Sequence, residues 1–252
     1  MKLPRFLSVV AALAAVTAMA GNSASAERLE ASFLLGLGRG PDATERAAWQ
    51  ARPEQPLADL VAQQKERLNA DAVERRAVFA RAWFDAHGCA PTAEEAAAAP
   101  VTGQTYVELV ERARTELTAK PEAYRKVLDY AYRSVVGRPP FTEELDFWKA
   151  RPTLSYVLVV GCLENWARRN APGLMVTSGQ PTICVTSDRL TTLQLTPAVA
   201  AEAHLVAGLL PLGERSLGLA RGCNVISPGA DNIVSVGGVH FIAVGGNRPA
   251  VQ

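Results

Sequence analysis

The sequence predicts an α+β protein, in which an all-helical array of three repeats of about fifty residues precedes a small β-rich part with one helix. Glycine, proline and aromatic residues recur in the same order three times between residues 28 and 170. Near Pro172-Gly173, charged and helix-forming residues give way to threonine, valine, isoleucine and glycine. The first 26 residues differ from both parts and have the composition of an export signal.

The N-terminal segment predicts that the chain is exported. Lys2 and Arg5 give it a positive start, and the apolar stretch Phe6–Met19 is shorter than the about 20 residues that span a bilayer. Ala24-Ser25-Ala26 then supplies small residues for a signal peptidase, so we expect cleavage after Ala26. An uncleaved N-terminal anchor is the alternative. No second apolar run of transmembrane length follows in the sequence, and the final compartment (periplasm, cell surface or extracellular space) is not specified.

Composition and motifs exclude several classes of function. Loss of Lys2 and Arg5 with the leader changes the formal net charge from +1 to −1, so charge alone attracts neither nucleic acid nor an anionic membrane. The sequence contains no HExxH, GxSxG, phosphate-loop or dinucleotide motif, and we expect no cofactor and no metal. The three histidines, His87, His204 and His240, are widely separated. These observations favour a non-enzymatic role.

The repeat register is anchored on three glycines that lie 50 and 49 residues apart, and the copies span about 28–70, 77–119 and 126–170 of a helical domain 27–171. Each glycine follows an aromatic residue by five positions and precedes a proline by three, a glutamate by seven and, in two copies, a tryptophan by eleven. These sets are Gly38, Gly88 and Gly137; Phe33, Trp83 and Tyr132; Pro41, Pro91 and Pro140; Glu45, Glu95 and Glu144; and Trp49, Ala99 and Trp148.

Each position in the repeat has a physical interpretation. The glycine is expected to end a helix with positive φ, and the proline three residues later prevents the helix from continuing. Thr44, Thr92 and Thr142 are expected to cap a second helix. Trp49 and Trp148 should pack from this helix against the aromatic residue of the first. A third helix completes each copy.

Arg39 and Arg138 directly follow two of the glycines. A guanidinium at this position can bond the last helical carbonyls or pair with a glutamate of the next helix. Contact with a ligand carboxylate or a sugar is the alternative.

The third copy resembles the repeat of DUF4214, a bacterial family of unknown function. The segment 131–140, Ala-Tyr-Arg-Ser-Val-Val-Gly-Arg-Pro-Pro, followed by Glu143-Glu144 and Trp148, carries the resemblance. The first copy lacks the tyrosine-arginine pair, and the second has Cys89 for the arginine and Ala99 for the tryptophan. That family is itself similar to the helical domain of phycobilisome linker polypeptides. The resemblance covers at most residues 28–170 and implies an exported or surface-associated helical module without a known reaction.

The β-rich part, 175–247, is expected to hold a helix from Pro197 to about Leu210 and three strands near 224–227, 232–236 and 239–244. Gly237-Gly238 predicts a hairpin turn, which favours an antiparallel meander over a parallel β-solenoid. Pairs of adjacent apolar residues in these strands place apolar side chains on both faces of the sheet. We therefore expect that both faces are covered or that one face binds a partner. Val234 and Phe241 are taken to report on the two different faces.

The four cysteines are spread over both parts. Cys184 and Cys223 flank the C-terminal helix, and we expect a disulfide that closes a loop of about 40 residues and stabilises the fold by about 3–4 kcal/mol. Whether Cys89 and Cys162 pair is left open.

Two functional hypotheses follow from the sequence. The first is an exported interaction protein that binds a protein or surface glycan through its helical repeats. The second is a secreted enzyme with a site at the junction of the helical and β parts. The sequence favours the first hypothesis but specifies neither the partner nor the oligomeric state.

Overall fold

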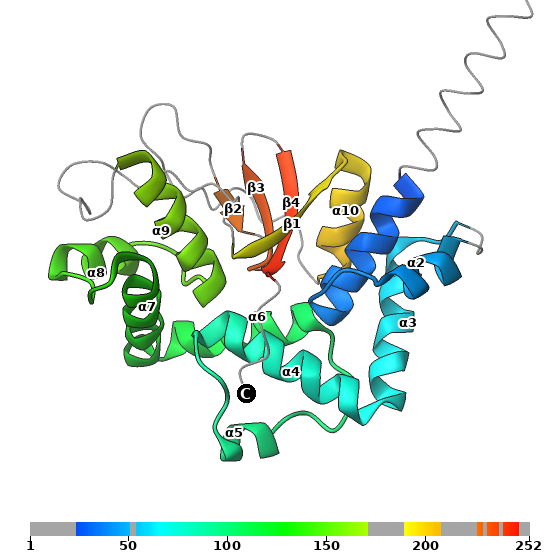
Figure 1. The fold of residues 1–252 in the computed structure, drawn as a ribbon, viewed down its shortest axis with the longest axis horizontal. Coiled ribbons are helices and arrows are strands. Elements are labelled where there is room, and N and C mark those ends of the chain that lie inside the picture. Colours follow the sequence, from blue (N-terminus) through cyan, green and yellow to red (C-terminus); the bar gives the residue numbers. More distant parts are fainter. Residues whose placement is uncertain are drawn as a thin grey trace, which may run out of the picture.

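The α+β class is confirmed by the computed structural model of the chain, which describes residues 24–50, 54–170, 189–207, 226–228, 231–236 and 239–246. Helices occupy most of residues 24–170, and a four-stranded sheet with one helix follows them (Figure 1). Nearly all of the expected signal sequence lies outside the described residues, as do Cys184, Cys223 and the Gly237-Gly238 turn. Within the described ranges, no helix combines the length and apolarity required to cross a membrane.

Each repeat folds into three helices. The first copy consists of the helix 24–37, α2 (Ala43–Gln50) and α3 (Leu57–Ala70). The second copy consists of α4 (Ala72–His87), α5 (Ala93–Ala97) and α6 (Tyr106–Ala119). The third copy consists of α7 (Pro121–Val136), α8 (Thr142–Lys149) and α9 (Tyr156–Asn170). Consecutive copies are joined by single residues, Asp71 and Lys120, so the array has almost no linker between its units.

The capping prediction is correct in one copy and wrong in two. Thr92 caps α5, because its hydroxyl accepts a bond from the Glu95 amide and the Glu95 carboxylate accepts one from the Thr92 amide. In the first copy the cap is Asp42, which bonds the Glu45 amide, and Thr44 lies inside α2. In the third copy Thr142 is the first residue of α8 and follows Phe141 at the cap. Aspartate is as good an N-cap residue as threonine. The position of a threonine therefore does not by itself identify the capping residue.

The C-terminal part forms an antiparallel sheet in the order β1-β4-β3-β2. Its elements are β1 (Leu190–Leu195), α10 (Pro197–Val206), β2 (Ile226–Pro228), β3 (Ile233–Val236) and β4 (Val239–Gly245). β2, β3 and β4 form the predicted meander, and β1 pairs with the free edge of β4. Every pairing is antiparallel, so the β-solenoid alternative is wrong for these strands.

Both faces of the sheet are buried against helices. Val234 and Ala243 join a core with α7, α8 and α9, while Ile242 and Val244 join a second core with the first helix, α3, α6 and α10. In Figure 1 the strands accordingly lie between α9 and α10. The β part therefore shares both hydrophobic cores with the repeats.

The expectation that Val234 and Phe241 report on different faces is wrong. The two residues are cross-strand partners in the β3–β4 ladder, and partners point to the same side of a sheet. Both contact the core that α7 and α9 line. Opposite faces are represented instead by neighbours along β4, Ile242 and Ala243. Two adjacent apolar residues always place one side chain on each face of the sheet. Such pairs therefore do not indicate which residues of neighbouring strands share a face.

Candidate binding pocket in the second repeat

The three repeat glycines have the same backbone geometry. Gly38, Gly88 and Gly137 each follow the end of a helix, with φ of 65°, 80° and 79°, which confirms the predicted helix ends. A tyrosine of the next copy packs on two of them: a β-carbon at Gly38 would lie 2.2 Å from the ring of Tyr106, and one at Gly88 would lie 2.5 Å from Tyr156. Glycine is thus required there by conformation and by close packing.

The same tyrosines make a second repeated contact. The Tyr106 hydroxyl donates to Asp85 over 2.9 Å, and the Tyr156 hydroxyl donates to Ser134 over 3.3 Å. Asp85 and Ser134 both lie three residues before their glycine. The equivalent bond therefore ties the third helix to the first helix in the second and third copies, which share this contact as well as sequence.

The arginine after the glycine forms a forked ion pair with the glutamate of the next helix in the first and third copies. Arg39 contacts Glu45 over 2.6 and 2.7 Å, and Arg138 contacts Glu144 over 2.8 Å from both nitrogens. Each arginine also bonds the backbone carbonyl of the following residue. This geometry confirms the structural interpretation of Arg39 and Arg138 as partners of the second helix.

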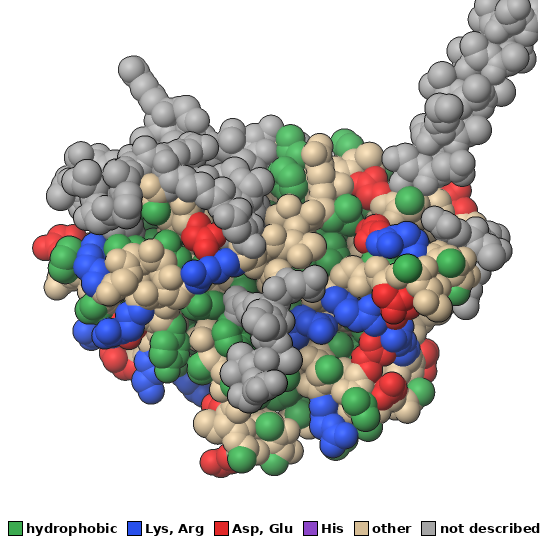
Figure 2. All heavy atoms as spheres, viewed as in Figure 1, with side chains coloured by type: hydrophobic (Ala, Val, Ile, Leu, Met, Phe, Trp, Pro, Cys, Tyr) green, Lys and Arg blue, Asp and Glu red, His purple; other side chains and the backbone are tan. Residues whose placement is uncertain are grey.

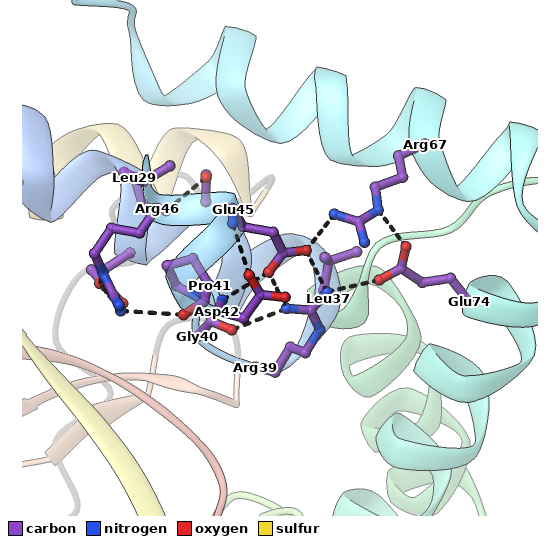
Figure 3. A network of polar contacts seen from close by, with 12 residues as sticks. Leu29, Leu37, Arg39, Gly40, Pro41, Asp42, Glu45, Arg46, Arg67 and Glu74 are labelled. Carbon is purple, nitrogen blue, oxygen red and sulfur yellow. Dashed lines mark hydrogen bonds and ion pairs between the residues drawn. The ribbon is translucent and has the colours of Figure 1, made fainter. Parts of the chain in front are cut away.

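Figure 3 shows how the first copy extends this pair into a network. Arg67 of α3 bonds Glu45 over 2.7 Å and also pairs with Glu74 of α4, which Arg39 reaches over 3.0 Å. The hydrogen bond from Arg39 is the main reason that the pKa of Glu45 falls from 4.5 to about 2. The network therefore joins the first copy to the second through charge.

The tryptophan of the second helix packs on the aromatic residue of the first helix, as predicted. Phe33 and Trp49 meet edge to face with ring centres 6.3 Å apart. The Trp148 indole donates to the Tyr132 hydroxyl over 3.1 Å, and both residues are buried. In these copies the arginine also approaches the same aromatic ring, at 5.5 Å for Arg39 over Phe33 and 6.0 Å for Arg138 over Tyr132.

The second copy keeps the bond at the start of its second helix, but that helix ends at Ala97, and both side chains are absent. Glu95 accepts from the Thr92 amide over 2.8 Å, as Glu45 and Glu144 do from the amides of Asp42 and Phe141. Cys89 replaces the arginine and Ala99 replaces the tryptophan. The Glu95 carboxylate therefore lacks the guanidinium that its two counterparts bind.

A pocket of about 200 Å³ lies between α4, α5 and α6 of this copy. Its lining residues are Phe79, Trp83, Glu95, Ala98, Leu109, Arg112, Ala113 and Glu116. The indole nitrogen of Trp83 is buried and has no hydrogen-bond partner among the described residues. Its counterpart in the third copy, Tyr132, receives the hydrogen bond of Trp148.

The third copy shows what fills the equivalent space. Four lining residues (Phe79, Trp83, Leu109 and Ala113) are followed 49 positions later by Leu128, Tyr132, Leu158 and Cys162. Those four residues and Trp148 all belong to one buried core. The pocket therefore lies where the third copy has a closed hydrophobic core, and the missing component is an indole ring.

No side chain of the second copy replaces the missing cation. His87 stacks on Trp83 with ring centres 4.1 Å apart, and burial lowers its pKa, so the ring is neutral at pH 7. Cys89 is half-buried, and burial raises its pKa, so it remains a neutral thiol. Arg112 lines the pocket but is paired with Glu116 over 3.1 Å.

Elsewhere the structure brings together residues that are distant in sequence. His204 and His240 lie 5.9 Å apart, ring centre to ring centre, and the Ser235 hydroxyl is 2.7 Å from Nδ1 of His240. Asp231 is fully buried at the turn before β3, and desolvation raises its pKa to about 7. Contacts with Ser155 and the charge of Arg114 oppose this rise of the pKa in part.

The surface carries no patch of a single charge that would indicate another class of site on the visible face. Basic and acidic side chains are interspersed with apolar ones over its described part (Figure 2). No group of three or more histidine, cysteine, aspartate or glutamate residues within the described ranges is placed to hold a metal ion.

Comparison with known proteins identifies no relative: no family model, no curated protein and no solved structure matches the chain.

Proposed function

We propose that the chain is an exported, non-enzymatic interaction protein whose second repeat binds an aromatic side chain of a partner protein. The observation that carries the proposal is the pocket between α4, α5 and α6, which lies where the third repeat has Trp148. The other two copies supply this aromatic ring from their own second helix. The second copy leaves the place open to a ring from outside.

The size and lining of the pocket support an aromatic occupant. A cavity of about 150 Å³ accommodates a benzene ring, and the pocket here measures about 200 Å³. Phe79, Trp83 and Leu109 offer apolar contacts, and the buried Trp83 indole offers one hydrogen bond to an acceptor. Burial of one aromatic side chain contributes about 1.5–3 kcal/mol, so the pocket would act as one anchor within a larger interface.

The same features favour a protein over a glycan. A sugar carries several hydroxyl groups, and each one that is buried needs a polar partner. The interior here is mainly apolar, and one face of Trp83 is already covered by His87. A glycan that stacks on Trp83 would therefore meet a ring with only one free face.

Export and surface association rest on the sequence. The basic, apolar and small-residue order of residues 1–26 supports a signal peptide, and the resemblance to the DUF4214 repeat supports a surface-associated module. Both agree with a protein that acts by binding in the envelope or outside the cell.

The test is capture of partners from the protein's own cell envelope with the mature chain, 27–252, as bait. Ala99→Trp fills the pocket from within and should abolish capture, because the variant supplies the ring that the partner would insert. Ala97→Trp is the matched control, since Ala97 is exposed on α5 and does not occupy the repeat position of Trp49 and Trp148. It adds the same side chain and should leave capture unchanged.

The captured partner must then lose binding when one of its own aromatic residues is replaced by alanine. If capture survives protease treatment of the envelope and is lost after glycosidase treatment, the partner is a glycan. That result would overturn the proposal of a protein partner. Equal capture by the wild type and Ala99→Trp would show that the pocket is not the binding site.

The enzymatic alternative has one observation in its favour, the hydrogen bond between Ser235 and His240. A hydroxyl nucleophile requires such a base. Neither His204 nor His240 bonds a carboxylate among the described residues, so the acid that would orient the base is not supplied there. Labelling of Ser235 by a fluorophosphonate, abolished in Ser235→Ala, would support this alternative.

A further inference from the structure

The second repeat lacks two side chains that its neighbours have, and the two losses coincide in space. In the first and third copies, the tryptophan and the arginine approach the same aromatic ring of the first helix. Tyr132 receives the indole hydrogen bond of Trp148 and lies 6.0 Å from the guanidinium carbon of Arg138. Phe33 likewise contacts Trp49 and Arg39. The ring and the cation are therefore neighbours wherever both are present.

The acceptor for the missing cation is still in place. Glu95 occupies the repeat position of Glu45 and Glu144 and keeps their bond to the backbone amide at the start of the helix. That bond fixes the carboxylate in the orientation that accepts a forked guanidinium in the other copies. Glu95 is also one of the residues that line the pocket. The carboxylate thus faces the same space as the vacant ring position.

Among the described residues Glu95 forms no ion pair, although the charge of Lys126 also acts on Cys89. Arg112 and Glu116 neutralise one another through their ion pair. His87 is neutral at pH 7 because burial lowers its pKa, and Cys89 is uncharged. One negative charge remains at the rim of an apolar pocket, and a partner of opposite charge would gain a charge-assisted hydrogen bond there.

We propose that the pocket recognises an aromatic residue together with a nearby arginine of the partner, so that the ligand restores both side chains that the second repeat lacks. The aromatic ring enters between α4 and α6 and contacts Trp83, and the guanidinium forms a fork with Glu95. Arginine is favoured over lysine because a planar guanidinium donates two parallel bonds to one carboxylate, as Arg39 and Arg138 do. This inference rests on the proposed function and adds the second half of the ligand.

The test uses the mature chain and synthetic peptides that carry one tryptophan and one arginine, one to four residues apart. A matched set has glutamine in place of the arginine. We expect the best arginine peptide to bind about tenfold tighter than its glutamine counterpart, measured by calorimetry, since a charge-assisted fork adds roughly this factor. A lysine peptide should fall between the two.

Glu95→Gln isolates the charge. Glutamine retains the capping geometry at this helix position, so the variant should fold and should bind arginine and glutamine peptides equally. Glu94→Gln is the control, because Glu94 is exposed and lies outside the pocket lining. It should preserve the tenfold preference.

The outcomes separate this inference from the proposed function. If the wild type binds both peptide sets equally and Glu95→Gln changes nothing, while Ala99→Trp abolishes binding, the aromatic pocket stands and the arginine inference is overturned. If no peptide binds the wild type, or Ala99→Trp binds as well as the wild type, the aromatic pocket itself is wrong. A preference for arginine that persists in Glu95→Gln would place the cation elsewhere and also overturn the inference.

Discussion

The second and third repeats share the glycine turn and the start of the second helix, and they differ in the length of that helix and in the side chains that follow the turn. In both, a glycine with positive φ ends the first helix and a glutamate bonds the amide at the start of the second. The third repeat then adds the forked pair of Arg138 with Glu144 and the buried Trp148. The second repeat has neither addition, and it contains a pocket.

This comparison separates what builds the repeat from what fills it. The glycine turn and the glutamate–amide bond are common to all three copies. The arginine and the tryptophan stabilise a copy that is already formed. The copy without them contains the pocket, on which the proposed function rests.

The largest expected effect is at the tryptophan position. Trp148→Ala should lower the free energy of unfolding by about 3–5 kcal/mol, because it removes a fully buried ring and its hydrogen bond to Tyr132. Ala99→Trp, the same position in the second copy, should leave the stability unchanged or raise it. Urea denaturation followed by circular dichroism measures both. A destabilisation by Ala99→Trp comparable to that of Trp148→Ala would mean that the two copies are not equivalent here.

The glycines provide the next test. Gly88→Ala should cost about 2–4 kcal/mol, because its β-carbon would lie 2.5 Å from the Tyr156 ring in addition to the cost of positive φ. Gly137→Ala should cost only about 1 kcal/mol, since no described atom lies within 4 Å of the added carbon. Equal losses for the two variants would show that the tyrosine contact adds nothing to the conformational requirement.

The ion pairs of Arg138 and Arg39 should contribute unequally to the free energy of unfolding. Arg138→Met leaves the Glu144 side chain, which is 1% exposed, without its guanidinium, and should cost about 2–3 kcal/mol. Arg39→Met should cost about 1 kcal/mol, because Arg67 still pairs with Glu45. Denaturation of the two variants under identical conditions provides the comparison. The opposite order would show that the Arg67–Glu74 network depends on Arg39.

Much of the helical array could be predicted from the sequence, because its signals are local. The spacing of glycines, prolines and tryptophans specifies where helices end and which rings meet, and the pairs Phe33–Trp49 and Tyr132–Trp148 follow from it. The β2-β3-β4 meander could also be predicted, because short links allow only antiparallel neighbours. The caps of α2 and α8 were wrong by one or two residues, since Asp42 and Thr44 are both acceptable caps and only the turn geometry chooses between them.

The binding pocket could not be predicted, although its signal was present in the sequence. Cys89 and Ala99 are departures from the repeat pattern, and in sequence they only weaken the assignment of the second copy. Their meaning depends on a spatial fact from the other two copies, in which the arginine and the tryptophan at these repeat positions both approach the aromatic residue of the first helix. The pairing of β1 with β4 and the placement of sheet residues in both cores also depend on long-range packing. No periodicity of a single segment encodes such contacts.

The smallest expected effect is the pH dependence of the Glu45 network. The pKa of Glu45 is about 2 in the folded chain and near 4.5 when unperturbed, so the ionised form stabilises the fold at pH values above about 5. This contribution is lost as the pH falls from 5 toward 2, because over this range the unfolded chain binds a proton at Glu45 and the folded chain does so only near pH 2. Glu45→Gln should therefore be less stable than the wild type at pH 7, and the difference should shrink steadily below pH 5. Glu95→Gln, which disrupts no arginine pair, should show a smaller difference at pH 7. A difference for Glu45→Gln that is the same at pH 7 and pH 2.5, measured by urea denaturation, would show that the network stabilises the first repeat by packing and not by charge.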